Sequence, residues 1–230
     1  MISKLSDLTA LAHVRSGQTV MVGGFGAPGT PFTLIEALLA LDVNDLVLVK
    51  ADANEGGMGI SRLIEAKRVK KIIISHLGLN SVVIGMKNRQ EVAVEFYPQG
   101  ILAEKIRAGG AGLVAILTDI GIATIIRENK QVVEVDGREA LVEPALRADV
   151  ALIHAAVADR AGNLVFAKTS RNFSPLMAMA ADRVIVEAER VVEIGEIPPD
   201  AIHTPGAFVD AVIELGPLPS AYEVLKHHVL

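Results

Sequence analysis

The sequence predicts an α/β protein with a largely parallel sheet, flanking helices and a small β-hairpin added to it. Short apolar runs rich in β-branched residues at 20–22, 46–49 and 71–74 are typical of buried strands. Helical patterns at 32–41 and 60–66 separate these runs, and such β-α-β-α alternation favours parallel strands joined by crossovers. An apolar content of 51% fits strands that are buried on both faces.

The first half of the chain continues this alternation. The N-terminal residues 2–15 predict an amphipathic helix packed on the sheet, with an inward face of Leu5, Leu8, Leu11 and Ala12. After the strand at 71–74, we expect a helix at 81–90, a strand at 92–96 and a short helix at 101–107.

The second half changes character. Alternating residues on both sides of Asp136-Gly137, between 131 and 142, predict a β-hairpin. Strands are then expected at 150–154 and 184–187, with a packed helix at 173–181 between them. Prolines between 198 and 219 predict an irregular segment before a last short helix.

Composition limits the possible function classes. The 230 residues predict one domain, 1–230, with a substantial core. The absence of cysteine excludes disulfides and thiolate catalysis, and the six histidines show no metal spacing, so we expect no metal site. A net charge of −5 and 3% aromatic residues give no reason to expect nucleic-acid binding. The apolar window 111–126 is too short for a membrane span and contains Asp119, and no secretory segment is evident, so a cytoplasmic location is expected.

A glycine-rich loop follows the strand at 20–22 and organises the chain. Its glycines permit positive φ and close approach of a ligand. Thr30 is expected to cap the helix at 32–41 and Pro31 to occupy its first position, which predicts an anion or phosphate site at that helix N-terminus. The loop consists of Gly23, Gly24, Phe25, Gly26, Ala27, Pro28 and Gly29.

Two other interpretations of this loop stay open. It could be a simple chain reversal. The spacing Gly24-x-Gly26-x-x-Gly29 also fits a dinucleotide fingerprint, with Asp52 as the acidic residue after the second strand. No Lys-Ser/Thr pair follows the loop, which excludes a P-loop.

Several ordered motifs together resemble the α subunits of family I coenzyme A transferases, over nearly the whole chain. They are the glycine loop, Pro98-Gln99-Gly100, Arg171-Asn172-Phe173 and the segments 75–80, 104–112 and 159–164. Within the family, the chain looks most like subunits that move CoA between acetoacetate and acetate or other short-chain fatty acids. It departs from the family pattern at Ser16-Gly17, at Ile101 and at residues 118–121, and the last two leave the acyl specificity open.

The resemblance implies an open α/β fold of the CoA-transferase type and roles for particular residues. It assigns residues 23–29 to CoA binding and Gln99 to the oxyanion hole, where the alternative is a turn glutamine bonded to nearby backbone. The family's nucleophilic glutamate lies in the β half, in a Ser-Glu-Asn-Gly-like motif that this chain lacks. We therefore expect a separate β subunit, an α2β2 heterotetramer, acyl-CoA and a small carboxylic acid as substrates, and no permanently bound cofactor.

Three alternative functions remain. A dicarboxylate-type (3-oxoadipate-like) CoA-transferase would use an added cation, with Arg107 or Arg171 as candidates. A non-catalytic CoA- or nucleotide-binding regulatory module belongs to a different class, and a NAD oxidoreductase has the least support. The glycines at 109, 110 and 112 either approach a substrate or partner or allow close helix packing, and His76 is expected to be a loop histidine.

Overall fold

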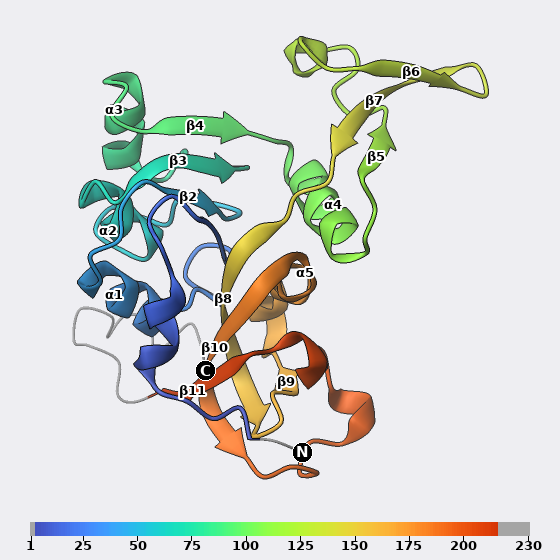
Figure 1. Ribbon diagram of the computed structural model, residues 1–230. Coiled ribbons are helices and arrows are strands. Elements are labelled where there is room, and N and C mark those ends of the chain that lie inside the picture. Colours follow the sequence, from blue (N-terminus) through green and yellow to red (C-terminus); the bar gives the residue numbers. More distant parts are fainter. Residues whose placement is uncertain (1–2, 216–230) are drawn as a thin grey trace.

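The computed structural model describes residues 3–215, which contain an eight-stranded sheet of order β11-β10-β8-β1-β2-β3-β4, with β9 paired to β8 (Figure 1). All neighbours along this order are parallel, and β9 is antiparallel to β8. The predicted fold class is therefore confirmed. The strands are β1 (Thr19–Val22), β2 (Leu46–Val49), β3 (Val69–Ile74), β4 (Ala93–Phe96), β8 (Ala148–Asp159), β9 (Leu164–Val165), β10 (Ala181–Val192) and β11 (Ala211–Glu214).

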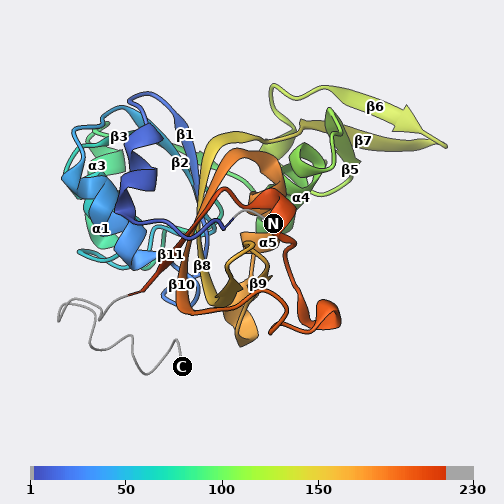
Figure 2. The same cartoon turned by 60° about the horizontal axis from the view of Figure 1, so that its bottom comes forward.

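Helices cover both faces of the sheet (Figure 2). Successive residues of a strand point to opposite faces, so Val20 and Val22 pack into one apolar cluster and Met21 into another. Helices α1 (Phe32–Ala40), α2 (Ile60–Glu65) and α3 (Ser81–Asn88) contribute to the first cluster, and α4 (Gln99–Gly110) and α5 (Ser174–Ala180) contribute to the second. Short 3-10 helices are η1 (Leu8–His13), η2 (Ile125–Arg127), η3 (Lys168–Arg171), η4 (Pro199–Ala201) and η5 (Gly206–Phe208).

The strand order reverses direction at β1. The chain proceeds from β1 to β2 on one side, whereas β8 pairs with the other side of β1. In open parallel sheets, ligands bind outside the carboxyl ends of the strands at such a switch point. The glycine loop begins there, since the Gly23 amide donates to the Leu152 carbonyl at 2.9 Å.

A separate antiparallel sheet projects from the body beside α4 (Figure 1), and we call it the arm. It consists of β5 (Ala115–Thr118), β6 (Val132–Val135) and β7 (Arg138–Pro144). The predicted hairpin is confirmed, because Asp136 and Gly137 both adopt positive φ between β6 and β7. The pairing of β5 with β7 was not predicted.

The predicted N-terminal helix is wrong. Residues 8–13 form only the short 3-10 helix η1, which Asp7 caps by accepting the Thr9 amide. Residues 4–6 are extended because they pair with the segment around Val212, so Leu5, Leu8 and Ala12 are exposed rather than inward. Of the four residues expected to face inward, Leu11 is buried.

The C-terminal part is more regular than predicted. Pro198, Pro199 and Pro205 lie in η4 or directly before η4 and η5, and the chain then returns to the sheet as β11, parallel to β10. Pro217 and Pro219 lie outside the described residues. The last short helix predicted from the sequence lies outside the described residues. Within residues 3–215, no helix combines the length and the apolar character needed to cross a membrane.

Candidate active site

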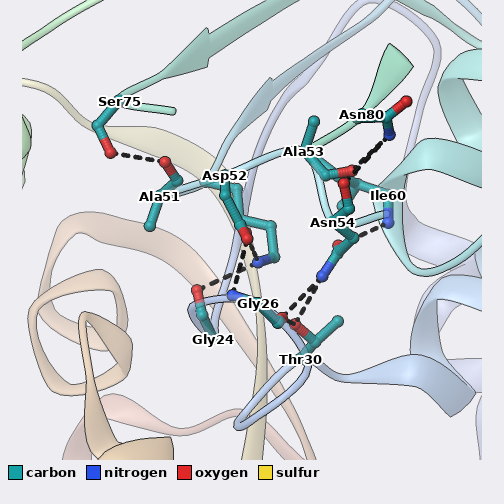
Figure 3. Close-up of polar contacts among 11 residues, drawn as sticks. Gly24, Gly26, Thr30, Ala51, Asp52, Ala53, Asn54, Ile60, Ser75 and Asn80 are labelled. Atoms are coloured by element: carbon teal, nitrogen blue, oxygen red, sulfur yellow. Dashed lines mark hydrogen bonds and ion pairs between the residues drawn. The ribbon is translucent and has the colours of Figure 1, made fainter. Parts of the chain in front are cut away.

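Side chains that follow β2 hold the glycine loop through hydrogen bonds (Figure 3). The Gly26 amide donates to Asp52 Oδ2 at 2.8 Å, and Asn54 Nδ2 donates to the Gly26 carbonyl at 2.7 Å. The Thr30 hydroxyl donates to the same carbonyl at 2.7 Å. Both polar groups of the Gly26 backbone are therefore used, and the loop has one fixed conformation.

Lys50 packs against the glycine loop and is 1% exposed. Its Nζ donates to Asp52 Oδ1 at 2.5 Å and to the Gly24 carbonyl at 3.2 Å. Burial lowers the pKa of Lys50, while the neighbouring Asp52 carboxylate opposes that shift. The sequence prediction missed this lysine, although a charged residue directly after a buried apolar strand is a detectable signal.

Asp52 does not have the role that a dinucleotide site requires. One carboxylate oxygen accepts from Lys50 and the other from the Gly26 amide, so this side chain is committed to the protein. In a dinucleotide site the acidic residue binds a ribose hydroxyl of the ligand, and Asp52 is not available for that contact. Asn54 is fixed in turn by the 75–80 segment, because Asn80 Nδ2 donates to the Asn54 carbonyl at 3.2 Å (Figure 3).

The predicted anion site at the N-terminus of α1 is wrong. Thr30 does not cap the helix, and Pro31 precedes its first residue, Phe32. Instead the Leu34 amide donates to Oε2 of Glu187, a residue of β10 that is 1% exposed. A carboxylate of the protein thus occupies the place where a phosphate was expected.

A buried histidine supports this carboxylate. His154 Nδ1 lies 2.9 Å from Glu187 Oε1, and Nε2 lies 2.9 Å from Glu189 Oε1. Burial alone would lower the pKa of His154, but the two glutamates raise it to about 9. At neutral pH His154 is therefore a cation that donates from both nitrogens, which does not suit a general base. The sequence prediction missed this cluster, because the three side chains meet across two strands.

Gln99 begins α4, and its side chain is exposed. Pro98 precedes it with φ −52° and ψ 137°, and the first bond of the helix runs from the Leu102 amide to the Pro98 carbonyl at 2.9 Å. Among residues 3–215, the amides of Gln99 and Gly100 and the side chain of Gln99 have no hydrogen-bond partner. In contrast to α1, α4 presents free donors at its N-terminus.

Gln99 and the glycine loop both lie beyond the carboxyl ends of the parallel strands, at the same end of the sheet, but they do not touch each other. Gln99 follows β4, which is separated from β1 by β2 and β3. Three strand spacings correspond to about 14 Å. An extended ligand across this end of the sheet could contact both.

Of the remaining candidates, Gly109 and Gly110 have a packing role, whereas Gly112 and His76 do not. Gly109 and Gly110 allow close packing, because a Cβ on Gly109 would lie 2.2 Å from the Leu146 carbonyl oxygen and a Cβ on Gly110 2.6 Å from Met179. Gly112 faces open space with φ +73°. His76 is an exposed loop residue whose backbone forms a bridge with Asp52.

The two arginine candidates lie in different surroundings. Arg107 is in the last turn of α4, eight residues from Gln99, and pairs with Glu104 at 2.8 Å. Arg171 is exposed and ends η3 directly after Ser170. The Ser170 carbonyl oxygen would lie 2.4 Å from a Cβ on Gly29, so Arg171 is beside the glycine loop.

The exposure of the candidate residues varies: Phe25 and Gln99 are exposed, whereas Gly23, Gly24 and Gly29 are buried. A cavity of about 630 Å³ is lined by arm residues such as Leu117 and Arg138, and one of about 320 Å³ lies beside residues 196–201. Neither is lined by the glycine loop or by Gln99. Within the described part of the chain, no group of three histidine, aspartate or glutamate residues is placed to hold a metal ion.

Known proteins resemble this chain over almost its full length. The family model for Coenzyme A transferase matches residues 7–215. A probable coenzyme A transferase subunit alpha from Bacillus subtilis (strain 168) is 50% identical over 206 residues, 89% of this chain and 90% of the relative. An acetate CoA-transferase subunit alpha from Escherichia coli (strain K12) is 46% identical over 214 residues, 93% and 97% of the two chains.

A solved structure shows the same fold. The apoenzyme of an acyl-CoA transferase from Escherichia coli O157:H7 matches with a TM-score of 0.82 at 23% identity. The match covers 93% of this chain and 47% of that one, so this chain spans about half of that protein.

Proposed function

The chain belongs to the coenzyme A transferase family, and we propose that it is the α subunit of a short-chain acyl-CoA:carboxylate CoA-transferase of the acetate and 3-oxoacid type. The observation that carries the proposal is that two features lie at the same end of the sheet, beyond the carboxyl ends of its parallel strands. A glycine loop with a fixed backbone lies there, and so does Gln99 with free amide donors. CoA thioesters are its substrates, and no permanently bound cofactor is part of the proposal.

The proposed chemistry requires donors rather than proton carriers. A glutamate carboxylate of a β subunit attacks the thioester carbonyl, CoA leaves as a thiolate, and an acyl-glutamyl anhydride forms. The thiolate then attacks the glutamyl carbonyl, releases the first carboxylic acid as its anion and leaves an enzyme-CoA thioester. The acceptor carboxylate attacks this thioester and expels the CoA thiolate, which forms a second anhydride. The thiolate finally attacks the acceptor's acyl carbonyl, so that the new acyl-CoA forms and the glutamate carboxylate is released. Each step replaces one anion by another, so no general base is needed.

Gln99 supplies the stabilisation that this chemistry needs. Negative charge develops on the carbonyl oxygen in each attack, and a neutral amide held at a helix N-terminus donates to it without adding a competing charge. Removal of one such donor typically costs about 3–4 kcal/mol of barrier. The free backbone amides of Gln99 and Gly100 point to the same role for this helix end.

The glycine loop binds the CoA portion through its backbone. Its seven residues, Gly23 to Gly29, offer no acid or base, and their value lies in close approach. Lys50, Asp52 and Asn54 hold the loop before a ligand arrives, so little ordering entropy is lost on binding.

A β subunit completes the site. Phe25 of the loop and Gln99 are exposed, whereas an anhydride intermediate must be kept from water. We propose that a β subunit covers this end of the sheet and supplies the nucleophile, in an α2β2 heterotetramer. The names of the relatives as α subunits support a separate partner.

A dicarboxylate-type transferase is the second candidate, and Arg171 favours it. Arg171 is exposed and follows Ser170, whose carbonyl group lies against Gly29 of the glycine loop, whereas Arg107 is paired with Glu104 at the far end of α4. A distal carboxylate would therefore pair with Arg171. Replacing Arg171 by Ala tests this: a tenfold or greater rise in KM for a dicarboxylate acceptor, with KM for acetate unchanged, would favour the second candidate over the first.

Reconstitution tests the proposal. The chain is co-expressed with a candidate β subunit, and CoA transfer from acetoacetyl-CoA to acetate is measured, with each subunit alone as control. We expect activity only in the mixture. A complex that is inactive with this pair but active with another acyl pair would change the substrate and keep the family chemistry. Robust CoA binding by the lone chain, without any β-dependent transfer, would favour the regulatory module.

Gln99→Ala tests the oxyanion role. We expect kcat to fall by about 10² to 10³ while the subunits still assemble, because the side chain is exposed and makes no hydrogen bond within the described chain. Unchanged turnover in an intact complex would reject this role for Gln99.

A further inference from the structure

We propose that Tyr97, Lys105, Lys130 and Glu143 form a clamp that positions Gln99, so that the base of the arm is part of the catalytic apparatus. This inference rests on the proposed function of Gln99. It concerns positioning residues, since none of the four is placed at the reacting atoms. We call the four side chains the Tyr97 clamp.

Glu143 is the centre of the clamp. It lies on β7 of the arm, is 1% exposed and uses both carboxylate oxygens. Oε2 accepts from Lys105 Nζ of α4 at 3.1 Å, and Oε1 accepts from Lys130 Nζ, in the segment just before β6. One buried carboxylate therefore joins the arm to the helix that begins with Gln99.

The two lysines also hold the ring of Tyr97. Lys105 Nζ lies 4.5 Å and Lys130 Nζ 5.2 Å from the ring centroid, both within cation–π range. The hydroxyl of Tyr97 donates to Glu95, which is paired with Lys71 of β3. The ring is thus fixed by two cations and its tip by a third charged residue.

The backbone transmits this restraint to Gln99. Tyr97 is two residues before Gln99, and its amide donates to the Ile74 carbonyl at 3.0 Å. The intervening Pro98 has a φ restricted by its own ring, so few dihedral angles separate the clamp from the oxyanion donor. A loosened Tyr97 would therefore move Gln99.

Stability alone is a poor reason for this arrangement. Buried ion pairs are often no more stabilising than apolar side chains of similar volume. Helix α4 already packs on the sheet and against α5 through apolar residues such as Leu102 and Ile106. The charges instead meet at the one tyrosine that leads into Pro98 and Gln99, which fits a positioning role.

The test compares variants of the full chain purified with its β subunit. Lys105→Met and Tyr97→Leu are expected to lower kcat about 10- to 100-fold with little change in KM, because small misplacements of a catalytic group cost rate rather than binding. Lys105→Arg keeps the charge and should retain most of the activity. Lys130→Met changes a partly exposed residue and leaves the Lys105–Glu143 pair in place, so it should give a smaller loss.

Arg127→Met is the matched control. Arg127 and Glu139 form an exposed two-bond ion pair on the same arm, at 2.8 and 2.9 Å, and neither touches Tyr97. We expect its kcat to be unchanged. A loss equal to that of Lys130→Met would show a general effect of the arm and overturn the clamp.

Two further readouts separate this inference from the role of Gln99. In a Gln99→Ala background, Tyr97→Leu should lower kcat by less than it does in the wild type, because residues that act through one another are not additive. A full additional loss would overturn the inference. Amide hydrogen exchange of Leu102, whose amide donates to the Pro98 carbonyl in the first bond of α4, should be faster in Lys105→Met than in the wild type, whatever the activity. Unchanged exchange would overturn the clamp alone, whereas unchanged kcat in Gln99→Ala would overturn the oxyanion role and its dependence on the clamp.

Discussion

Asp52→Asn is the most informative single change, because it removes a charge without changing the shape of the side chain. The new amide can still accept from Gly26, but the Lys50 ammonium loses its carboxylate partner at a site that is 1% exposed. Leaving one partner of a buried ion pair alone typically costs about 3–5 kcal/mol. We expect the free energy of unfolding to fall by about that amount at pH 7.

The protonation of Lys50 sets an upper limit on this cost. An unpaired buried lysine can release its proton, and this costs about 1.4 kcal/mol for each pH unit below its unfolded pKa of 10.5. The limit is therefore about 5 kcal/mol at pH 7 and about 2 kcal/mol at pH 9. The sign follows from proton binding: between the lowered folded pKa and 10.5 the unfolded chain binds more protons, so the stability of the variant rises with pH.

Urea denaturation of wild type and variant at pH 7 and pH 9 measures both quantities. The destabilisation should shrink at the higher pH. The double variant Lys50→Met/Asp52→Asn serves as a control, since it removes the unpaired charge and should recover much of the lost stability at pH 7. A destabilisation that is equal at both pH values, or a double variant as unstable as the single one, would refute the reasoning.

The remaining predictions concern the backbone of the loop and the buried histidine. Gly29→Ala should cost more stability in urea denaturation than Gly57→Ala, because both glycines have φ near +75° but only Gly29 has a carbonyl oxygen 2.4 Å from the new Cβ. Equal costs would show that φ strain alone matters. His154→Gln should remove a pH dependence: wild-type stability is expected to fall by up to about 3 kcal/mol as pH rises from 6.5 to 9, because the folded state binds the extra proton between these values. An unfolding free energy of the wild type that stays constant over this range would contradict a charged His154.

The sequence predicted those strands, helices and turns that are determined by a few adjacent residues. The strand before Gly23, the helix after Pro31 and the hairpin at Asp136-Gly137 depend on a few adjacent residues, and all three were confirmed. The placement of Gln99 after a strand was also evident from its motif. These features need no knowledge of distant partners.

Features that depend on distant pairing were not predictable in this way. The carboxylate at the N-terminus of α1 comes from Glu187, 153 residues away, so no local pattern connects it with Thr30 and Pro31. Leu5 is apolar at helical spacing, yet its backbone pairs with the segment around Val212. In both cases a long-range contact overrode a reasonable local propensity.

The position of β1 also determines how the chain can fold during synthesis. Val20 pairs with Val150, so the second neighbour of this central strand is made 130 residues later. At ribosomal rates of roughly 5 to 20 residues per second, that interval is roughly 7 to 26 s. One edge of β1 stays unpaired throughout, which exposes a nascent chain to aggregation and favours slow folding. The glycine loop therefore leaves the ribosome long before the β8 residue Leu152, whose carbonyl accepts the Gly23 amide, has been made.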